Sequence, residues 1–384
     1  MTGVSFEFAT AGRVIVGRGR ASELPSLLAG LGSRVLVCTG SRPASHAGLL
    51  AGLQLPAAVV TADREPTIES ARAATEAARE HGADVVAAIG GGSVIDLGKA
   101  AAMLLANGGD PLDYLEVVGS GRKITEAAVP LVAVPTTAGT GTEVTANAVL
   151  ASPGHQVKAS LRSGLMIPRV ALVDPLLTLT CPGPVTAASG LDALTQCLEP
   201  FVSPRANAVT DCLARGGLRR AGSGLRRAYA DGADVEARTD MALCSLLGGM
   251  ALANAKLGAV HGLASVIGGT ADVPHGAACA ALLAPVVEAN VRALRSGPQG
   301  RPALSRYAEA AQLLTGNPRA AIEDGVAWIR ETVTRLRTPG LRELGLREAD
   351  FGDVAAKAVK ASSTQGNPVV LAEDDLCAIL AEAA

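Results

Sequence analysis

Residues 84–100 have the sequence DVVAAIGGGSVIDLGKA, and this stretch decides the fold. The segment 84–89, which is apolar after Asp84, predicts a buried β-strand, and the sequence GGGS at 90–93 follows it without a spacer. Glycines let a backbone approach a pyrophosphate closely, and Ser93 at the start of a helix can donate an N–H group to it. The spacing matches neither GxGxxG nor a Walker A loop, so a plain strand-to-helix turn is the alternative interpretation.

Two further strands are predicted around this turn. Residues 34–39 (RVLVCT) predict a buried strand that stops at Gly40, and residues 131–135 (LVAVP) predict another. The Ala- and Glu-rich segment 69–81 predicts a helix before the central strand. Strands that alternate with helices predict a parallel α/β sheet, which binds ligands at its carboxyl edge.

The strand at 131–135 ends in a threonine- and glycine-rich cluster, TTAGTGTE at 136–143. Its hydroxyls suit phosphate and ribose contacts, although Thr140 or Thr142 could instead serve only as a helix cap. Two small, hydroxyl-bearing loops after neighbouring strands favour an anion-binding edge more than either loop does alone.

The second half of the chain has a different pattern. Pro182 and Pro184 mark a break, after which the sequence predicts mostly helices. These helices cover residues 187–202, 206–221, 237–255, 277–291, 305–314 and 320–336. We therefore predict an α/β dinucleotide-binding domain over residues 1–179 and an all-helical domain over residues 180–384.

Composition excludes several classes of partner. The 384 residues carry a net charge of -2, with 34 basic and 36 acidic side chains, which argues against nucleic-acid binding. No apolar run reaches the roughly 18 residues of a membrane-spanning helix, so no membrane partner is expected. The 7 cysteines are scattered and form no CxxC pair, which favours reduced thiols in a cytoplasmic protein.

A series of short motifs occurs in order along the chain. They are GGGSVIDLGKA at 90–100, PTTAGTGTEVT at 135–145, VALVDP at 170–175, LDALTQCLEPFVSPRAN at 191–207, GAVHGLASVIGG at 258–269 and VPHGAACAALLAPVVEAN at 273–290. This set resembles the iron-containing (group III) alcohol dehydrogenase family, which includes the maleylacetate reductases. The resemblance implies a Rossmann-like domain and a helical metal-bearing domain, the dehydroquinate synthase-like architecture. It also implies hydride transfer between NAD(P) and an aldehyde, ketone or alcohol, and a homodimer.

The resemblance also implies where the cofactor binds. The predicted contacts are Gly40, Ser41, Gly91, Gly92, Ser93, Asp96, Thr136, Thr137, Thr140 and Lys158. NAD-preferring members place an acidic residue after the first strand, whereas here Gly40 is followed by Ser41 and Arg42. No carboxylate would repel a 2′-phosphate, and Arg42 supplies positive charge. We predict a preference for NADPH or use of both cofactors; a solvent-facing Arg42 is the alternative.

The family's metal site is altered in this chain. Family members hold a divalent ion with an aspartate, a histidine four residues later and two further histidines. The corresponding residues here are Asp192, Gln196, His261 and His275. Asp192 and Gln196 lie one turn apart on a predicted helix, so they share a face. An amide oxygen is nevertheless a poorer ligand for iron or zinc than imidazole is.

Neighbouring residues modify the expected chemistry further. Family members commonly carry a proton-relaying histidine at the position of Ser265, and a serine cannot act unaided as a general base near neutral pH. Cys197 and Cys279 lie beside the expected ligands, and we predict that both only pack in the core.

Three hypotheses follow for the site. In the first, a metal ion polarises the carbonyl while NAD(P)H delivers hydride. In the second, the enzyme works without metal, as the resemblance to maleylacetate reductases implies, and His261 or His275 donates the proton. In the third, the protein is a dehydroquinate synthase-like lyase or cyclase, or a non-catalytic nucleotide-binding protein. The expected catalytic residues are His261, His275 and Ser265, acting on a small carbonyl or alcohol.

Overall fold

The computed structural model describes residues 5–155, 157–271, 273–297 and 300–384. Its contacts divide the chain into two compact units. The first, called the α/β unit, comprises Thr10–Thr137 and Gly141–Thr178. The second, called the helical unit, comprises Leu179–Ala384, the short segment Ala138–Thr140 and the described residues up to Ala9.

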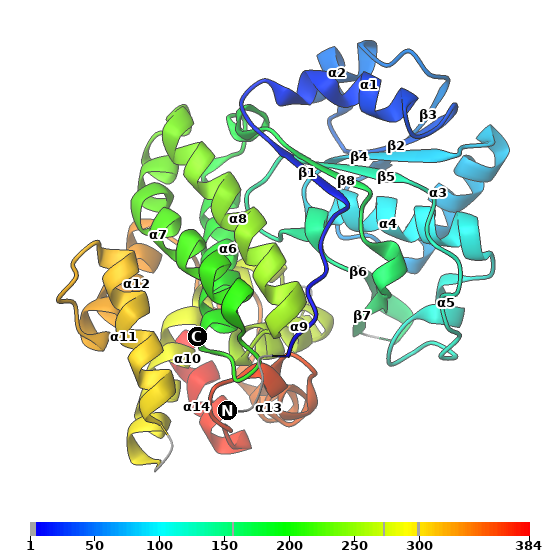
Figure 1. Ribbon diagram of the computed structural model, residues 1–384. Helices are drawn as coiled ribbons and strands as arrows, with labels where there is room; N and C mark the ends of the chain where they lie inside the picture. Colours follow the sequence, from blue (N-terminus) through cyan, green and yellow to red (C-terminus); the bar gives the residue numbers. More distant parts are fainter. Residues whose placement is uncertain (1–4, 156, 272, 298–299) are drawn as a thin grey trace. The chain divides into compact units, whose positions relative to one another are not determined.

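The α/β unit is built on a parallel sheet with the strand order β1-β8-β5-β4-β2-β3 (Figure 1). Its strands are β1 (Arg13–Val16), β2 (Val35–Gly40), β3 (Ala57–Ala62), β4 (Val85–Gly90), β5 (Leu131–Pro135) and β8 (Val170–Val173). The three strands predicted from sequence form β2, β4 and β5. Strands covered on both faces carry continuous apolar runs, which explains why these three strands could be predicted from the sequence.

Helices cover both faces of this sheet (Figure 1). They are α1 (Leu24–Ala29), α2 (Ala47–Ala51), α3 (Ile68–His81), α4 (Gly92–Asn107) and α5 (Pro111–Tyr114). Leu24 and Leu28 of α1 pack on the face that presents Val37 and Ile89, whereas α3 and α4 pack on the opposite face. A hairpin of β6 (Asn147–Ser152) and β7 (Val157–Arg162) lies beside α4.

The order of the strands contains one reversal of direction. The chain passes from β2 outward to β3 and then returns to the other side of β2 to form β4. The carboxyl ends of β2 and β4 are adjacent, with Thr39 paired to Ile89, and Gly90 of β4 is paired to Pro135 of β5. In open α/β sheets, ligands bind outside the carboxyl ends at such a reversal.

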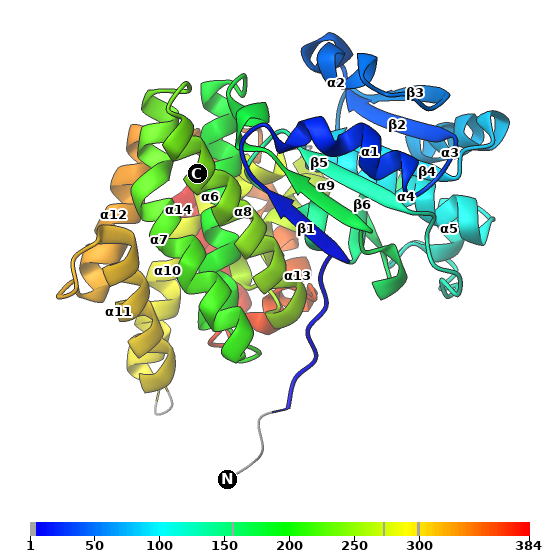
Figure 2. The same ribbon diagram turned by 45° about the horizontal axis from the view of Figure 1, so that its top comes forward.

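The helical unit consists of α-helices and short connections. These are α6 (Gly183–Val202), α7 (Ala208–Ala230), α8 (Val235–Ala255), α9 (Ala259–Ala271), α10 (His275–Ser296), α11 (Arg301–Thr315), α12 (Ile322–Arg335), α13 (Phe351–Lys360) and α14 (Glu373–Ala383). In Figure 2, α6, α7 and α8 lie side by side. Together with the N-terminal sheet, they establish the α/β plus all-helical fold class predicted from sequence.

Glycines explain two differences from the predicted helices. The predicted helix ends before Gly222, whereas α7 continues past this residue. Gly222 is there for packing, because a Cβ would lie 2.5 Å from the carbonyl oxygen of Leu314 and only glycine permits this approach. Helix α9 was not predicted, since its glycines disfavour a helix in isolation. Gly262 is required there, because a Cβ would lie 2.0 Å from Thr364 Oγ1.

Helices α8 and α9 meet at a sharp bend of 97°. Lys256, between them, adopts a positive φ of 68°, a conformation that non-glycine residues seldom adopt. Helix α10 is long and apolar enough to cross a membrane by composition, but 78% of that window is buried. It is therefore a core helix of the helical unit, and it brings His275 to the same core as His261.

Candidate metal centre and cofactor edge

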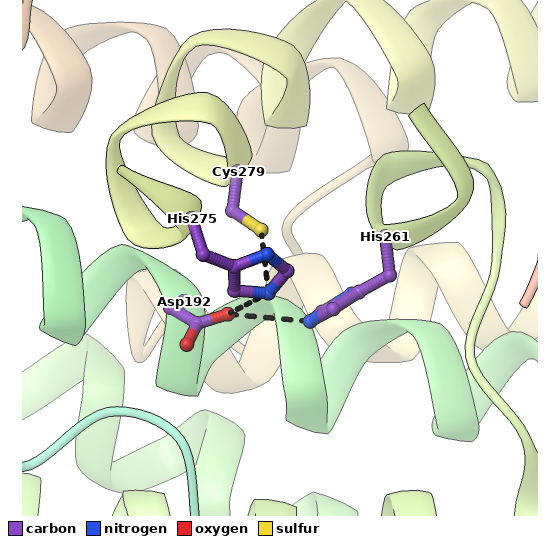
Figure 3. Close-up of side chains that lie close together, drawn as sticks. All are labelled: Asp192, His261, His275 and Cys279. Atoms are coloured by element: carbon purple, nitrogen blue, oxygen red, sulfur yellow. Dashed lines mark hydrogen bonds and ion pairs between the residues drawn. The ribbon is translucent and has the colours of Figure 1, made fainter. Parts of the chain in front are cut away.

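Three helices of the helical unit bring four metal-binding side chains together (Figure 3). They are Asp192 from α6, His261 from α9, and His275 and Cys279 from α10, and their ligand atoms all lie within 4.8 Å of one another. His261 Nε2 lies 3.2 Å from Asp192 Oδ1, and His275 Nε2 lies 3.9 Å from the same oxygen. All but His275 are buried.

Several buried atoms at this cluster lack a hydrogen bond among the described residues. They are Asp192 Oδ1, Gln196 Oε1 and His261 Nε2. Buried polar atoms are normally hydrogen-bonded, so each exception requires an explanation. Carboxylate, imidazole and thiol groups are the donors that zinc and iron bind in proteins. The unpaired atoms and the donor set both fit a divalent metal ion.

Glu199 orients His261 from behind. Its Oε2 lies 2.7 Å from His261 Nδ1, and its carboxylate also accepts hydrogen bonds from the backbone N–H groups of Gly258 and Val260. This arrangement assigns the Nδ1 proton to the Glu199 contact and leaves Nε2 facing Asp192, where a metal ion could take the place of a proton, as in carboxylate–histidine–metal triads. Glu199 was not predicted from the sequence, although it lies two helical turns after Asp192 on the same face.

Charge at the cluster alters the protonation of its members. Burial alone would lower the pKa of His261, but the carboxylates of Glu199 and Asp192 outweigh it and raise that pKa to about 10. Burial would raise the pKa of Asp192, but the facing His261 and His275 hold it below its usual range. Burial and the nearby carboxylates of Asp192 and Glu199 raise the pKa of the Cys279 thiol. A metal ion would therefore compete with protons for these atoms.

Gln196 contacts the cluster through its amide. Its Nε2 donates a hydrogen bond of 3.0 Å to Asp192 Oδ2, which leaves Asp192 Oδ1 facing the histidines. The shared helical face predicted for the two residues is thus present, and Gln196 positions the carboxylate.

The two cysteines beside the site differ. Cys197 Sγ lies 3.8 Å from Cys244 Sγ in the core, in keeping with a packing role. We expected Cys279 only to pack as well, whereas its Sγ lies within the cluster, 3.6 Å from His275 Nε2. Cys279 follows His275 by one helical turn, so the sequence could have predicted that both side chains lie on the same face of a helix.

Ser265 lies one turn after His261 on α9. It is exposed, and its hydroxyl donates a hydrogen bond of 2.8 Å to the His261 carbonyl. The place of Ser265 among the catalytic residues stays a prediction.

The α/β unit places the predicted cofactor loops along one edge. Gly40 is the last residue of β2, and Ser41 follows it. Gly91 precedes α4, and this helix begins without a side-chain cap. A helix N-terminus without such a cap leaves N–H groups for a phosphate. Thr136 donates its N–H to the Gly90 carbonyl at 2.9 Å, so the loops after β4 and β5 are in contact. Gly92 and Ser93 begin α4, and Thr137 lies beside Thr136 in the loop after β5.

Three of the predicted cofactor residues have contacts within the protein. Asp96 accepts hydrogen bonds from Thr142 Oγ1 at 2.6 Å and from the Val149 N–H at 3.0 Å, which gives its carboxylate a structural role. Lys158 on β7 forms an ion pair with Glu65. Thr140 lies in the segment that groups with the helical unit.

Comparison with known proteins identifies the family. The model named iron-containing alcohol dehydrogenase matches residues 11–175, and the model of the Fe-containing alcohol dehydrogenase C-terminal part matches residues 186–384. The chain belongs to the iron-containing alcohol dehydrogenase family. It is accordingly an oxidoreductase of the kind that transfers hydride between a nicotinamide and an alcohol or carbonyl group.

Individual relatives of this iron-containing alcohol dehydrogenase family member extend over most of the chain. Alcohol dehydrogenase 4 of Saccharomyces cerevisiae is 36% identical, covering 83% of this chain and 80% of the yeast protein. The NAD-dependent methanol dehydrogenase of Bacillus methanolicus is 30% identical, covering 96% of this chain and 97% of the Bacillus protein. The crystal structure of a 1,3-propanediol oxidoreductase superimposes with a TM-score of 0.91 at 32% identity, covering 99% of this chain and 100% of that one.

Proposed function

We propose that this member of the iron-containing alcohol dehydrogenase family interconverts a small aldehyde or ketone with its alcohol in a metal-dependent reaction. The observation that carries the proposal is that the facing Asp192 Oδ1 and His261 Nε2 are buried beside His275 without a hydrogen bond among the described residues. These three side chains would hold the ion, and Glu199 would orient His261. The ion would supply Lewis-acid polarisation of the carbonyl or alcohol oxygen.

The residues of the site exclude water, leave one histidine accessible and orient the carboxylate of Asp192. Burial of Asp192 and His261 excludes water, which strengthens electrostatic interactions there. His275 is the most accessible member, with 34% of its side chain exposed, so it is the group that can contact substrate. Gln196 holds one oxygen of Asp192, which leaves the other for the ion.

For the cofactor, we propose that the enzyme accepts NADPH, alone or alongside NADH. Ser41 and Arg42 follow β2 at the reversal of strand order, where the adenosine ribose of a dinucleotide binds in folds of this kind. Both are exposed, and Arg42 makes no ion pair within the described ranges. An arginine at this point can pair with a 2′-phosphate.

Variants of the ligands test the metal-dependent reaction. Asp192→Asn and His275→Ala should lose tightly bound metal, measured by mass spectrometry of the metal content, and carbonyl-dependent NADPH oxidation should fall with it. Asp353→Asn is the matched control, because Asp353 is exposed and pairs only with Lys357 among the contacts described. Variants that keep full activity without metal would instead support the metal-free, maleylacetate reductase-like mechanism.

A further inference from the structure

Cys279 is buried in the helical unit with its sulfur directed at the other ligand atoms (Figure 3). It comes from α10, one turn after His275, and both side chains face Asp192 and His261. The thiol is accompanied by an independent sign of a ligand, since Asp192 Oδ1 and His261 Nε2 beside it are buried, form no hydrogen bond among the described residues and face each other at 3.2 Å.

Two of the separations between ligand atoms are close to those between ligands of one ion, and all lie within 4.8 Å. Two nitrogen, oxygen or sulfur ligands at about 2.0–2.3 Å from a tetrahedral ion lie roughly 3.3–3.7 Å from each other. Cys279 Sγ lies 3.6 Å from His275 Nε2, and His261 Nε2 lies 3.2 Å from Asp192 Oδ1. The separation of 3.9 Å between His275 Nε2 and Asp192 Oδ1 is slightly wider. A small movement of the partly exposed His275 would close it.

The residue in place of the family's remaining histidine offers only an amide oxygen to a metal ion, since Oε1 of Gln196 is buried without a hydrogen bond in the described part of the chain. Gln196 uses its Nε2 to hold Asp192 Oδ2, and an amide oxygen is a weak donor for iron or zinc. A thiolate is a much stronger donor for these ions than an amide is. The chain therefore contains a better fourth ligand than the one at the expected position.

We propose that the Cys279 thiolate is a metal ligand in this protein and completes the site with Asp192, His261 and His275. The inference rests on the metal ion of the proposed function and adds its ligand set. On binding, the metal–sulfur bond forms, the S–H bond breaks, and the proton leaves to solvent. One thiolate, one carboxylate and two imidazoles form a set that suits zinc or cobalt, because soft sulfur donors favour zinc.

Cobalt(II) titration of the full-length protein tests this ligand. A cobalt–thiolate bond gives a near-ultraviolet charge-transfer absorption that oxygen and nitrogen ligands do not give. The wild type should develop this band up to one equivalent of cobalt, and Cys279→Ala should bind cobalt at least tenfold more weakly and lack the band. Cys197→Ala is the matched control, since Cys197 is equally buried on α6 but contacts Cys244, and it should keep the band.

X-ray absorption of the zinc-loaded wild type gives a test without any variant. It should show one sulfur neighbour at about 2.3 Å. A band that persists in Cys279→Ala, or one bound zinc without a sulfur neighbour, would overturn the assignment. If carbonyl reduction still required metal in that case, the proposed function would stand and only the thiolate ligand would fall. Failure of the wild type to bind any metal would overturn both.

Discussion

Among single residues, Glu199 orients the site without being one of the candidate ligands. It binds the far nitrogen of His261 and two backbone N–H groups at the start of α9. One side chain thus sets both the orientation of the imidazole and the position of the helix that carries it. Such carboxylates alter metal affinity although they do not touch the ion.

Glu199→Gln should weaken metal binding by roughly ten- to a hundredfold. The amide accepts less strongly than the carboxylate from His261 Nδ1, so the ring loses its fixed orientation. Competition with a chromophoric chelator measures the affinity. Glu323→Gln is the control, because Glu323 pairs with Arg295 and is exposed. Equal affinity in wild type and Glu199→Gln would contradict this role.

The protonation of His261 makes stability depend on pH in the metal-free protein. Because Glu199 and Asp192 raise its pKa to about 10 from the ordinary 6.5, the folded state binds a proton that the unfolded state has already lost between these values. The stabilisation is complete below about pH 6.5 and is lost as the pH rises through about 10.

Urea unfolding of metal-free wild type and His261→Gln at several pH values checks this. The difference in free energy of unfolding between the two proteins should shrink as the pH rises toward 10. A difference that stays constant over this range would show that His261 is not protonated in the folded protein.

Among the elements, α4 and the loop after β5 are joined by Lys99. Its ammonium group is buried and donates to Thr142 Oγ1, to the carbonyl and hydroxyl oxygens of Thr145, and to the Asn147 carbonyl, at 2.9–3.0 Å. Burial lowers the pKa of Lys99 to about 8 in spite of nearby Asp96 and Glu143. The lysine therefore fixes the threonine- and glycine-rich loop to the helix that begins the cofactor edge.

Lys99→Met should lower the free energy of unfolding by about 3–5 kcal/mol, because it leaves buried acceptors and Asp96 without their cation. Denaturant unfolding measures the loss. Lys123→Met, at an exposed position, should change stability by less than about 0.5 kcal/mol. A similar small effect at Lys99 would mean that its hydrogen bonds contribute little to holding the loop.

Arg42, just after the carboxyl end of β2, is the residue on which the predicted use of NADPH depends. Arg42→Ala should raise the KM for NADPH by about tenfold, equivalent to roughly 1.4 kcal/mol, and leave the KM for NADH unchanged. Arg219→Ala, an exposed arginine on α7, is the control. Steady-state kinetics with both cofactors decides, and a parallel change for NADH would argue against contact with the 2′-phosphate.

At the scale of the whole molecule, the sequence predicted the sheet better than the site. Buried parallel strands have continuous apolar runs, so β2, β4 and β5 could be predicted from the sequence. Helix α9 could not, because its glycines disfavour a helix locally and their packing partners lie far along the chain. Asp192 and Gln196 followed from helical spacing. Glu199 and Cys279 have equally regular spacing, but only the packing of α6, α9 and α10 shows which helix faces meet.

The most direct test of the whole account is carbonyl-dependent oxidation of NADPH and NADH by chelator-treated protein, before and after reloading with Fe(II) or Zn(II). We predict that activity disappears with the metal and returns when one equivalent is restored. Full activity after complete removal of metal would contradict it and would favour a mechanism in which His261 or His275 donates the proton without a metal ion.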